Sequence, residues 1–301
     1  VNTGLVGFAA PDANGNWSGF DVAICRAVAA AVLGDPSKVK YVPTTGQTRF
    51  TALASGEVDV LARNSTWTFL RDNDLKLDFV GVNYYDGQGF MVPKALGVSS
   101  AKELDGATVC IQTGTTTELN LADFFKANNM TYLPIAIDTN AEGEQQYLAG
   151  ACDAYTTDAS GLAATRAAFA DPENHIILPE IISKEPLGPV VRHGDNQWGD
   201  IVRWTLFALV AAEEYGITSA NLEELSKGSA NPEIDRMLGT SGDLGPMMGL
   251  DNLWAKRAIA ASGNYGEIFA ATIGESTPIG LARGLNAQWT QGGLLYSPPF
   301  R

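Results

Sequence analysis

The sequence predicts an α/β protein built from two similar units in series. Strand-like and helix-like segments alternate from the N-terminus to about residue 62, and the alternation restarts at residue 107. Two extended segments, 87–94 and 182–195, lie where the chain would pass between the units. Strands that alternate with helices imply a parallel sheet covered by helices. The length of 301 residues is enough for a large core and two domains.

The first unit is expected to begin with a strand end and a loop over residues 1–8. The Asn14-Gly15 pair marks a turn, and apolar residues then recur at helical spacing from Phe20 until Gly34 ends the helix. Three further segments complete the unit: a strand in "KVKYVPT" (38–44), a helix in "QTRFTALASG" (47–56), and a strand in "EVDVLA" (57–62).

The second unit repeats this order. Its predicted strands are 107–112, 131–137 and 152–158, and its predicted helices are 119–129, 141–150 and 159–170. A long helix over about 197–215 and a tail of helices and Gly- and Pro-rich loops follow the second extended segment. We therefore assign residues 1–90 and 190–301 to a first lobe and residues 91–189 to a second.

Composition excludes several classes of function. The net charge is -14, from 20 basic and 34 acidic residues, which opposes binding to nucleic acid or to an anionic membrane. No segment approaches the roughly 18 apolar residues of a membrane helix. The three cysteines and two histidines lack the spacing of a zinc site, so we expect no metal and no cofactor.

Polar side chains follow three predicted strands. They are Asn64, Thr66 and Arg71 after the first strand, the run Thr113–Thr117 after the second, and Asp158 after the third. Ligands of open α/β sheets bind outside the carboxyl ends of strands, so these groups are expected to converge in a cleft that closes by hinge motion. An arginine and a helix N-terminus suit a carboxylate, and an aspartate suits an ammonium. The set predicts a site for a zwitterion.

Each group also has an ordinary structural explanation. The run "TGTTTE" could be a helix N-cap with Glu118 in a capping box. Arg71 could pair with Asp72 or Asp74 at the surface, and Asp158 could cap the helix that follows it. Catalysis has less support, because no nucleophile elbow, phosphate loop or histidine near a candidate serine or cysteine is present.

Several motifs resemble those of family 3 periplasmic solute-binding proteins, which serve polar amino acid transporters. The resemblance covers essentially the whole chain. It lies in "GFDVAICRAVAAAV" (19–32), "TRFTALASGEVDV", "VCIQTGTTTELNL" and "CDAYTTD", and a general amino acid-binding subgroup shares the tail "GNYGEIF…RGLNAQW…GGLLYSPPFR". The resemblance implies a type II periplasmic-binding fold, with two lobes joined by two hinge strands and a C-terminal extension. One departure is Ala23, where the family usually has an acidic residue.

The resemblance also implies roles for individual residues. Arg71 would hold the α-carboxylate with the help of Thr66 and the Thr116 backbone N–H, next to Thr113 and Thr115. Asp158 would take the α-ammonium, with the help of the Asn64 carbonyl. The side-chain pocket would be neutral and roomy, since Asn2 and Leu5 line it and Gly46 lies near the position of a lost aromatic residue. Arg63 would reach the ligand side chain or be structural.

The two strands that contain Cys110 and Cys152 should be neighbours in such a fold, which implies a disulfide and leaves Cys25 single. The implied protein is not an enzyme. It is the periplasmic substrate-binding component of an ABC uptake transporter, a monomer whose signal peptide has been removed, and it binds free L-amino acids broadly and delivers them to the inner-membrane permease subunits. Two alternatives are a cyclohexadienyl or arogenate dehydratase on the same fold, with Glu118 as its acid, and a sensor module for a membrane receptor.

Overall fold

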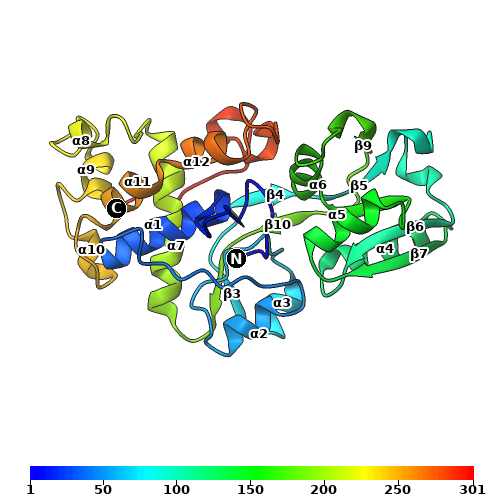
Figure 1. Ribbon diagram of the computed structural model, residues 1–301. Coiled ribbons are helices and arrows are strands. Elements are labelled where there is room, and N and C mark those ends of the chain that lie inside the picture. The colour runs from blue at the N-terminus through cyan, green and yellow to red at the C-terminus, as the bar shows by residue number, and fades with distance from the viewer.

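The computed structural model describes residues 1–301, and a five-stranded sheet forms the smaller of its two units, on the right in Figure 1. The sheet order is β7-β6-β8-β5-β9. β6 runs parallel to both of its neighbours, whereas β5 is antiparallel to β8 and β9. The elements are β5 (Gln88–Pro93), η1 (Lys94–Leu96), η2 (Ala101–Glu103), β6 (Ala107–Gln112), α4 (Thr116–Ala127), β7 (Tyr132–Ile137), α5 (Asn140–Leu148), β8 (Ala154–Asp158), α6 (Ala159–Ala167), η3 (Pro172–Asn174) and β9 (His175–Ile177).

Both faces of this sheet are covered, as the apolar strands require. Alternate residues of a strand point to opposite faces. Val109 and Ile111 of β6 accordingly pack in one cluster with Phe125 of α4, while Cys110 packs in another with Tyr147 of α5. The predicted alternation of strands and helices is therefore confirmed in this unit, although α4 begins three residues earlier than expected.

The larger unit is mainly helical. A cluster of 31 buried hydrophobic residues joins α1, α7, α11 and α12. The predicted limits of α1 are confirmed, because Gly34 ends the helix in the left-handed conformation at φ 70°. The helices are α1 (Phe20–Leu33), α2 (Arg49–Ala54), α3 (Phe69–Asn73), α7 (Asn196–Glu214), α8 (Leu222–Leu225), α9 (Pro232–Leu238), α10 (Leu244–Met247), α11 (Trp254–Ser262), α12 (Tyr265–Thr272), η4 (Gly284–Asn286) and η5 (Trp289–Gln291).

The prediction of a parallel sheet in the first unit is wrong. Residues 38–44 and 57–62 form no ladder; each pairs through one residue, Thr44 with Asn2 and Leu61 with Val190. Pro43 has no N–H to donate to a ladder, and the partner strand at Val190 spans only three residues. The apolar pattern marked burial of extended chain rather than strand pairing. The strands of this unit form antiparallel pairs: β1 (Ala10–Pro11) with β2 (Trp17–Ser18), and β3 (Leu77–Phe79) with β11 (Val190–Arg192).

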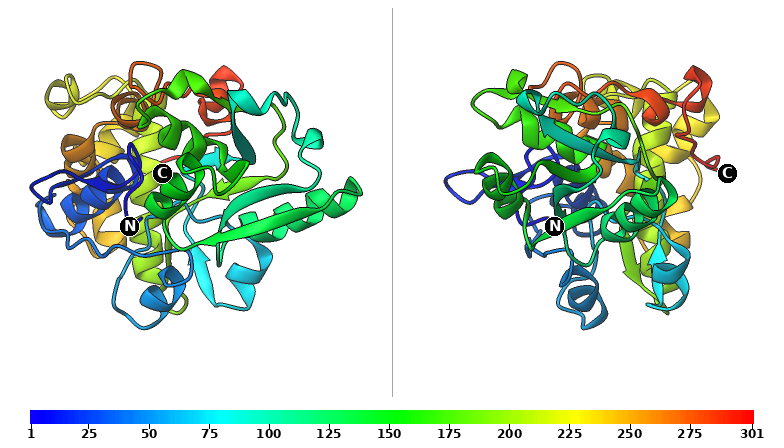
Figure 2. Two further views of the ribbon diagram at one scale, coloured as in Figure 1. Left: turned by 45° about the vertical axis from the view of Figure 1, so that its right-hand side comes forward. Right: turned by 90° about the vertical axis from the view of Figure 1, so that its right-hand side faces the viewer.

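Two paired strands connect the units. β4 (Tyr84–Asp86) and β10 (Glu185–Leu187) are antiparallel, and their segments run side by side between the units in Figures 1 and 2. They correspond to the two hinge strands that the resemblance implies. The sheet of the smaller unit begins just after them, at Gln88. The lobe boundaries at 90/91 and 189/190 remain a prediction.

The C-terminal extension, residues 220–301, holds the free edge of β4. Tyr85 lies opposite Pro186, which lacks an N–H. The backbone N–H and carbonyl of Tyr85 bond instead to the side chain of Asn286. The Tyr85 N–H donates to Asn286 Oδ1 at 2.7 Å, and Asn286 Nδ2 donates to the Tyr85 carbonyl at 3.1 Å. The buried Tyr265 hydroxyl donates to the Asn83 carbonyl at 2.8 Å. The extension therefore fixes the strand that enters the second unit.

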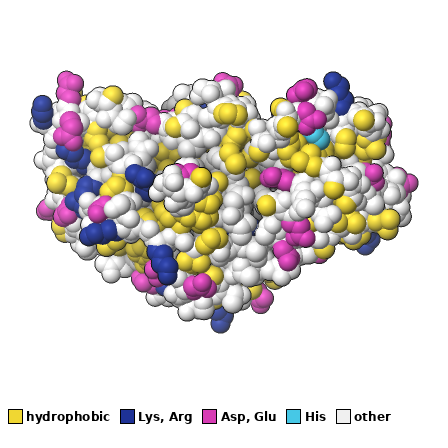
Figure 3. All heavy atoms as spheres, viewed as in Figure 1, with side chains coloured by type: hydrophobic (Ala, Val, Ile, Leu, Met, Phe, Trp, Pro, Cys, Tyr) yellow, Lys and Arg dark blue, Asp and Glu magenta, His cyan; other side chains and the backbone are white.

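The surface shows dispersed charge. Asp and Glu side chains are scattered over the face seen in Figure 3 and do not gather in one patch. None of the helices is both long enough and apolar enough to span a bilayer.

Candidate functional site

Arg71 lies in α3, just after the polar segment that follows residue 62. Thr68 caps this helix by accepting a hydrogen bond from the Arg71 N–H, and the Arg71 side chain is buried. Its Nη1 donates to the Thr66 carbonyl at 2.9 Å, and its guanidinium lies 4.9 Å from the centre of the Phe50 ring. Arg71 forms no ion pair, so the alternative of a surface pair with a neighbouring aspartate is wrong.

Two more buried arginines, Arg49 and Arg63, lie near Arg71, and neither forms an ion pair. Arg49 Nη1 donates to the Asn64 carbonyl at 3.2 Å and to Ser65 Oγ at 3.1 Å, while its Nε has no partner. Arg63 Nε donates to the Thr44 carbonyl at 3.1 Å, and its Nη2 has no partner. The three guanidinium groups therefore keep positive charge and unused donors inside the protein.

Burial disfavours the charged form of all three arginines. It lowers the pKa of Arg63 and the pKa of Arg71 to about 10 each. The pKa of Arg49 is lowered further below its usual value, first by burial and then by the positive charges of the other two. Carboxylates act in the opposite direction, because Asp158 and Glu185 both favour the charged form of Arg49 and of Arg71. An additional anion at this point would stabilise the cluster.

Asp158 ends β8 and faces this cluster. It is 6% exposed and accepts a hydrogen bond from Asn64 Nδ2 at 3.4 Å. Asp158 occupies the N-cap position of α6, but its side chain makes no cap hydrogen bond, so its carboxylate does not serve the helix. Burial raises its pKa well above the usual range, and the negative charges of Asp86 and Glu185 raise it further. A cationic group would favour the carboxylate form here.

The Asn64 side chain connects this carboxylate to the N-terminal segment. Asn64 Oδ1 accepts a hydrogen bond from the buried Asn2 at 3.1 Å, so both residues lie at the site. The Asn64 carbonyl, which was expected to help hold the ammonium, instead accepts from Arg49. Leu5 is 3% exposed and belongs to the large hydrophobic cluster of the helical unit. Its expected place in the side-chain pocket remains a prediction.

The run Thr113–Thr117 lies where β6 passes into α4. Thr115 makes no side-chain cap bond, and its hydroxyl donates to the Gln112 carbonyl at 2.7 Å. Glu118 is exposed and accepts from the Gly114 N–H at 3.4 Å, so the expected capping box is absent. The first N–H groups of a helix have no partner within the helix. At α4, which has 12 residues, these N–H groups are available to an anion.

Three polar contacts connect the units across the site. Gln47 Nε2 donates to Thr113 Oγ1 at 2.6 Å, Asn64 Nδ2 donates to Asp158, and the hydroxyls of Thr66 and Thr116 lie 3.4 Å apart. Gly46 also fits closely here, because a Cβ at this position would come within 2.7 Å of the Thr113 carbonyl. No aromatic side chain can be placed at position 46 unless the neighbouring backbone shifts. Because these contacts join the two units across the site, the units are in a closed arrangement.

Arg49 and Glu185 are the residues at this site that the sequence did not reveal. Arg49 stands in a six-residue helix that was predicted only as a helix, and Glu185 stands in a crossing segment that was predicted only as a connection. The one sequence signal for Arg49 is its place in "TRFTALASGEVDV", a segment that resembles the family. No local signal marks Glu185.

The disulfide is confirmed. Cys110 and Cys152 are bonded, with their Cα atoms 5.6 Å apart, and Cys25 is free. β6 and β8 are parallel neighbours, and Cys152 lies just before β8, within reach of Cys110 although Cys110 itself lies opposite Tyr155.

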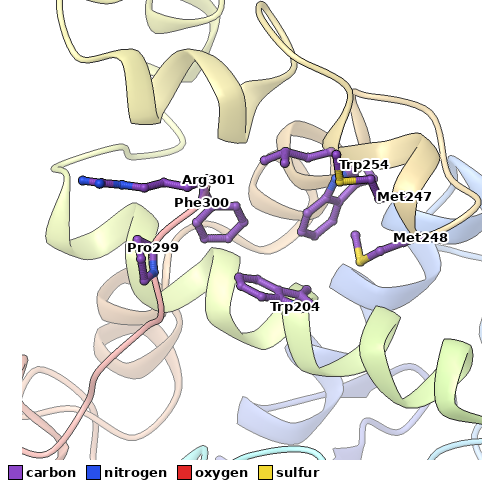
Figure 4. Close-up of a pocket in the computed structure, with 8 residues that line it drawn as sticks. Trp204, Met247, Met248, Trp254, Pro299, Phe300 and Arg301 are labelled. Carbon is purple, nitrogen blue, oxygen red and sulfur yellow. The ribbon is translucent and has the colours of Figure 1, made fainter.

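A small apolar hollow of about 160 Å³ lies far from these residues, at the C-terminal end (Figure 4). Trp204, Trp254 and Phe300 line it, and the ring centres of Phe300 and Trp204 lie 5.2 Å apart. The hollow lacks a buried charged group. Its aromatic residues anchor the last residues of the chain to α7 and α11.

The chain resembles known proteins over its whole length. It is 76% identical over 300 residues to the glutamate/glutamine/aspartate/asparagine-binding protein BztA of Rhodobacter capsulatus, with coverage of 100% of this chain and 89% of that protein. It is 60% identical over 303 residues to the general L-amino acid-binding periplasmic protein AapJ of Rhizobium johnstonii, with the same coverage of 100% and 89%.

The solved structure of an ABC transporter periplasmic binding protein from Brucella ovis, with glutathione bound, is 57% identical and has a TM-score of 0.97. The match covers 100% of this chain and 94% of that one. Residues 1–220 match the family described as bacterial extracellular solute-binding proteins, family 3. The predicted family and α/β periplasmic-binding fold are confirmed: this chain belongs to family 3 of the bacterial extracellular solute-binding proteins.

Proposed function

We propose that the chain is the periplasmic amino acid-binding component of an ABC transporter, and that free L-amino acids with polar side chains bind between its two units. The observation that carries this proposal is the set of three buried arginines without ion pairs, next to the buried Asp158. BztA is named for glutamate, glutamine, aspartate and asparagine, and AapJ for L-amino acids in general. Both are binding proteins, and this chain is not an enzyme.

The zwitterion part of the ligand accounts for two of the charged groups. Arg71 and the N-terminus of α4, at Thr116, would hold the α-carboxylate by charge-assisted hydrogen bonds. Asp158, oriented by Asn64, would hold the α-ammonium. These pairs give each buried charge the partner that it lacks in the protein alone.

The remaining arginines favour a particular class of side chain. Arg49 Nε and Arg63 Nη2 are buried donors without partners. Asn2 also lies at the site, because it donates a hydrogen bond to the side chain of Asn64. Three buried carboxylates, Asp158, Glu185 and Asp21, act on the three guanidinium groups, so the unpaired donors rather than a net charge favour one class of side chain. A side-chain carboxylate or amide can accept from the free donors. Acidic and amide amino acids should therefore bind more tightly than cationic or purely apolar ones.

The dehydratase alternative needs a positioned acid in the cleft. Glu118, its candidate, is exposed and bonds to the Gly114 N–H, so it offers no proton donor at the site. The sensor alternative finds no supporting feature in these residues. Delivery of the bound amino acid to inner-membrane permease subunits, by a monomeric carrier, is the partnership that we propose.

Calorimetry of the refolded, ligand-free protein tests the proposed function. We expect binding of glutamate, glutamine, aspartate and asparagine, weaker binding of arginine and leucine, and rejection of an α-amide and a D-isomer that cannot satisfy both Arg71 and Asp158. Tight binding of the α-amide would contradict the carboxylate role of Arg71. A protein that binds no amino acid in the panel would contradict the function itself.

The affinity for glutamine is also expected to fall as the pH is lowered from about 7 to about 5, where glutamine itself does not titrate. A bound ammonium lowers the pKa of Asp158, which burial raises in the closed protein. The complex then holds fewer protons than the free protein, so affinity increases with pH, by at most about tenfold per unit. Calorimetry at several pH values measures this slope. Asp158→Asn should bind weakly with a shallower profile, because Asp86, whose pKa burial raises to about 6, still titrates in this range. An equally steep profile in that variant would contradict the assignment.

A further inference from the structure

Glu185 occupies an unusual position at the site. It is the first residue of β10, lies opposite Asp86 of β4, and is 1% exposed. It is therefore a buried acidic residue on the strands that connect the two units. It forms no ion pair with a lysine or arginine. A buried charge without an ion pair is costly unless hydrogen bonds satisfy it.

Four side-chain donors surround this carboxylate. Its Oε2 accepts from the hydroxyl of Thr66 and, at 2.9 Å, from the hydroxyl of Thr116. Its Oε1 accepts from Asn120 Nδ2 at 2.7 Å and from Ser183 Oγ at 2.6 Å. An ionised carboxylate has about four lone-pair sites and only accepts hydrogen bonds. The arrangement therefore satisfies Glu185 completely in its charged form.

These donors come from both sides of the site. Thr116 and Asn120 are four residues apart at the start of α4, so they lie on one face of that helix. Thr66 belongs to the segment that leads into Arg71, and its carbonyl accepts from the Arg71 guanidinium. One carboxylate on the connecting strand thus joins the N-terminal turn of α4 to the segment that holds Arg71.

We infer that Glu185 is a positioning residue for amino acid binding, which fixes the N-terminus of α4 and Arg71 so that both face one ligand carboxylate. This inference rests on the proposed function. It also changes the roles of the two threonines. Because the Thr66 and Thr116 hydroxyls donate to Glu185, the donors that remain for the ligand are the backbone N–H groups of α4 and the free guanidinium donors.

Glu185→Gln is the sharpest test, because it keeps the shape of the side chain and removes acceptor capacity. The amide nitrogen must face two of the four donors, so either the threonine pair or Asn120 and Ser183 lose their acceptor. Glu180→Gln is the matched control. Glu180 precedes the connecting segment and accepts from Ser100 Oγ and from the Ala101 N–H at 3.0 Å, inside the smaller unit.

Calorimetry with glutamine and with glutamate, together with thermal melting, gives the readouts. We expect Glu185→Gln to raise the Kd by about tenfold to hundredfold, by a similar factor for both ligands, because the contacts it positions serve the carboxylate that both share. Glu180→Gln should keep the wild-type Kd. A merely structural role would lower the melting temperature and leave the Kd of the folded protein unchanged, and that result would overturn the inference.

Asn120→Ala gives a second measurement, which decides the matter if Glu185→Gln does not fold. It keeps the Glu185 charge and removes one connection to α4, so the Kd should again rise. In the double variant the two effects should not add, since both break the same connection. Full additivity, or an unchanged Kd in Asn120→Ala, would overturn the inference. If the wild type binds amino acids and these variants match it, only the role of Glu185 fails; if the wild type binds none, the proposed function fails first.

Discussion

Replacing Arg71 with alanine is expected to weaken L-amino acid binding by about 2–5 kcal/mol, the range for removing one partner of a buried charge pair. This corresponds to a rise in Kd of roughly 30-fold to several thousand-fold. The reason is that the guanidinium is buried, has no acidic partner in the protein, and is expected to receive the ligand α-carboxylate. Calorimetric titration with glutamine and glutamate measures the change.

Two further variants separate charge from geometry. Arg71→Lys keeps the charge but loses the planar pair of donors, so its Kd should lie between those of the wild type and Arg71→Ala. Arg203→Ala is the control, because Arg203 forms its ion pairs with Asp200 at 2.8 Å and with Asp78 at 3.4 Å away from the site. Arg71 also stacks on Phe50, so the melting temperature of each variant is measured alongside. Binding by Arg71→Ala within a few-fold of the wild type would place the carboxylate elsewhere.

Part of the site could be predicted because topology constrains it. Polar groups that follow strands at one edge of a sheet lie close together whatever their separation in sequence. That rule accounts for Thr116 and Asp158, which follow β6 and β8 of one sheet. Asn64, Thr66 and Arg71 follow a segment of the other unit that forms no ladder, and contacts of Asn64 with Asp158 and of Thr66 with Thr116 connect the two groups. The structure places these residues close together, and their role as a ligand site remains a prediction.

The rest of the site depends on contacts that no local pattern encodes. Arg49 is buried because Phe50 and the Asn64 carbonyl surround it, and Glu185 is satisfied by donors from two units. A sequence pattern reports the periodicity of one segment and not which distant segment covers it.

The two units differ in how well their strands could be predicted. In the smaller unit, β6 spans Ala107–Gln112 as expected, because an apolar strand between two others must form ladders on both edges. In the larger unit, Leu61 is buried, but a single pair with Val190 replaces a ladder. Apolar alternation reports burial of one face, and pairing requires a partner strand of matching length and register.

Removing the disulfide by replacing Cys110 and Cys152 with alanine is expected to destabilise the smaller unit. The bond closes a loop of sequence separation 42, for which loop-closure entropy predicts a loss of about 4 kcal/mol. That loop contains α4 and the run Thr113–Thr117, so the bond also stabilises one side of the proposed site. Denaturant unfolding of the oxidised wild type and the double variant measures the difference.

The tryptophans make this measurement specific for one unit. All six lie outside residues 88–177, so their fluorescence follows the larger unit, while far-ultraviolet circular dichroism follows both. The double variant should lose its dichroism at lower denaturant concentration than its fluorescence. Cys25→Ala is the control and should change little, because Cys25 is free and half-buried. Thiol titration of the unreduced, denatured wild type should find Cys25 alone. Three reactive thiols would show that the pair does not form, and coincident transitions in the double variant would show that the bond does not stabilise the smaller unit selectively.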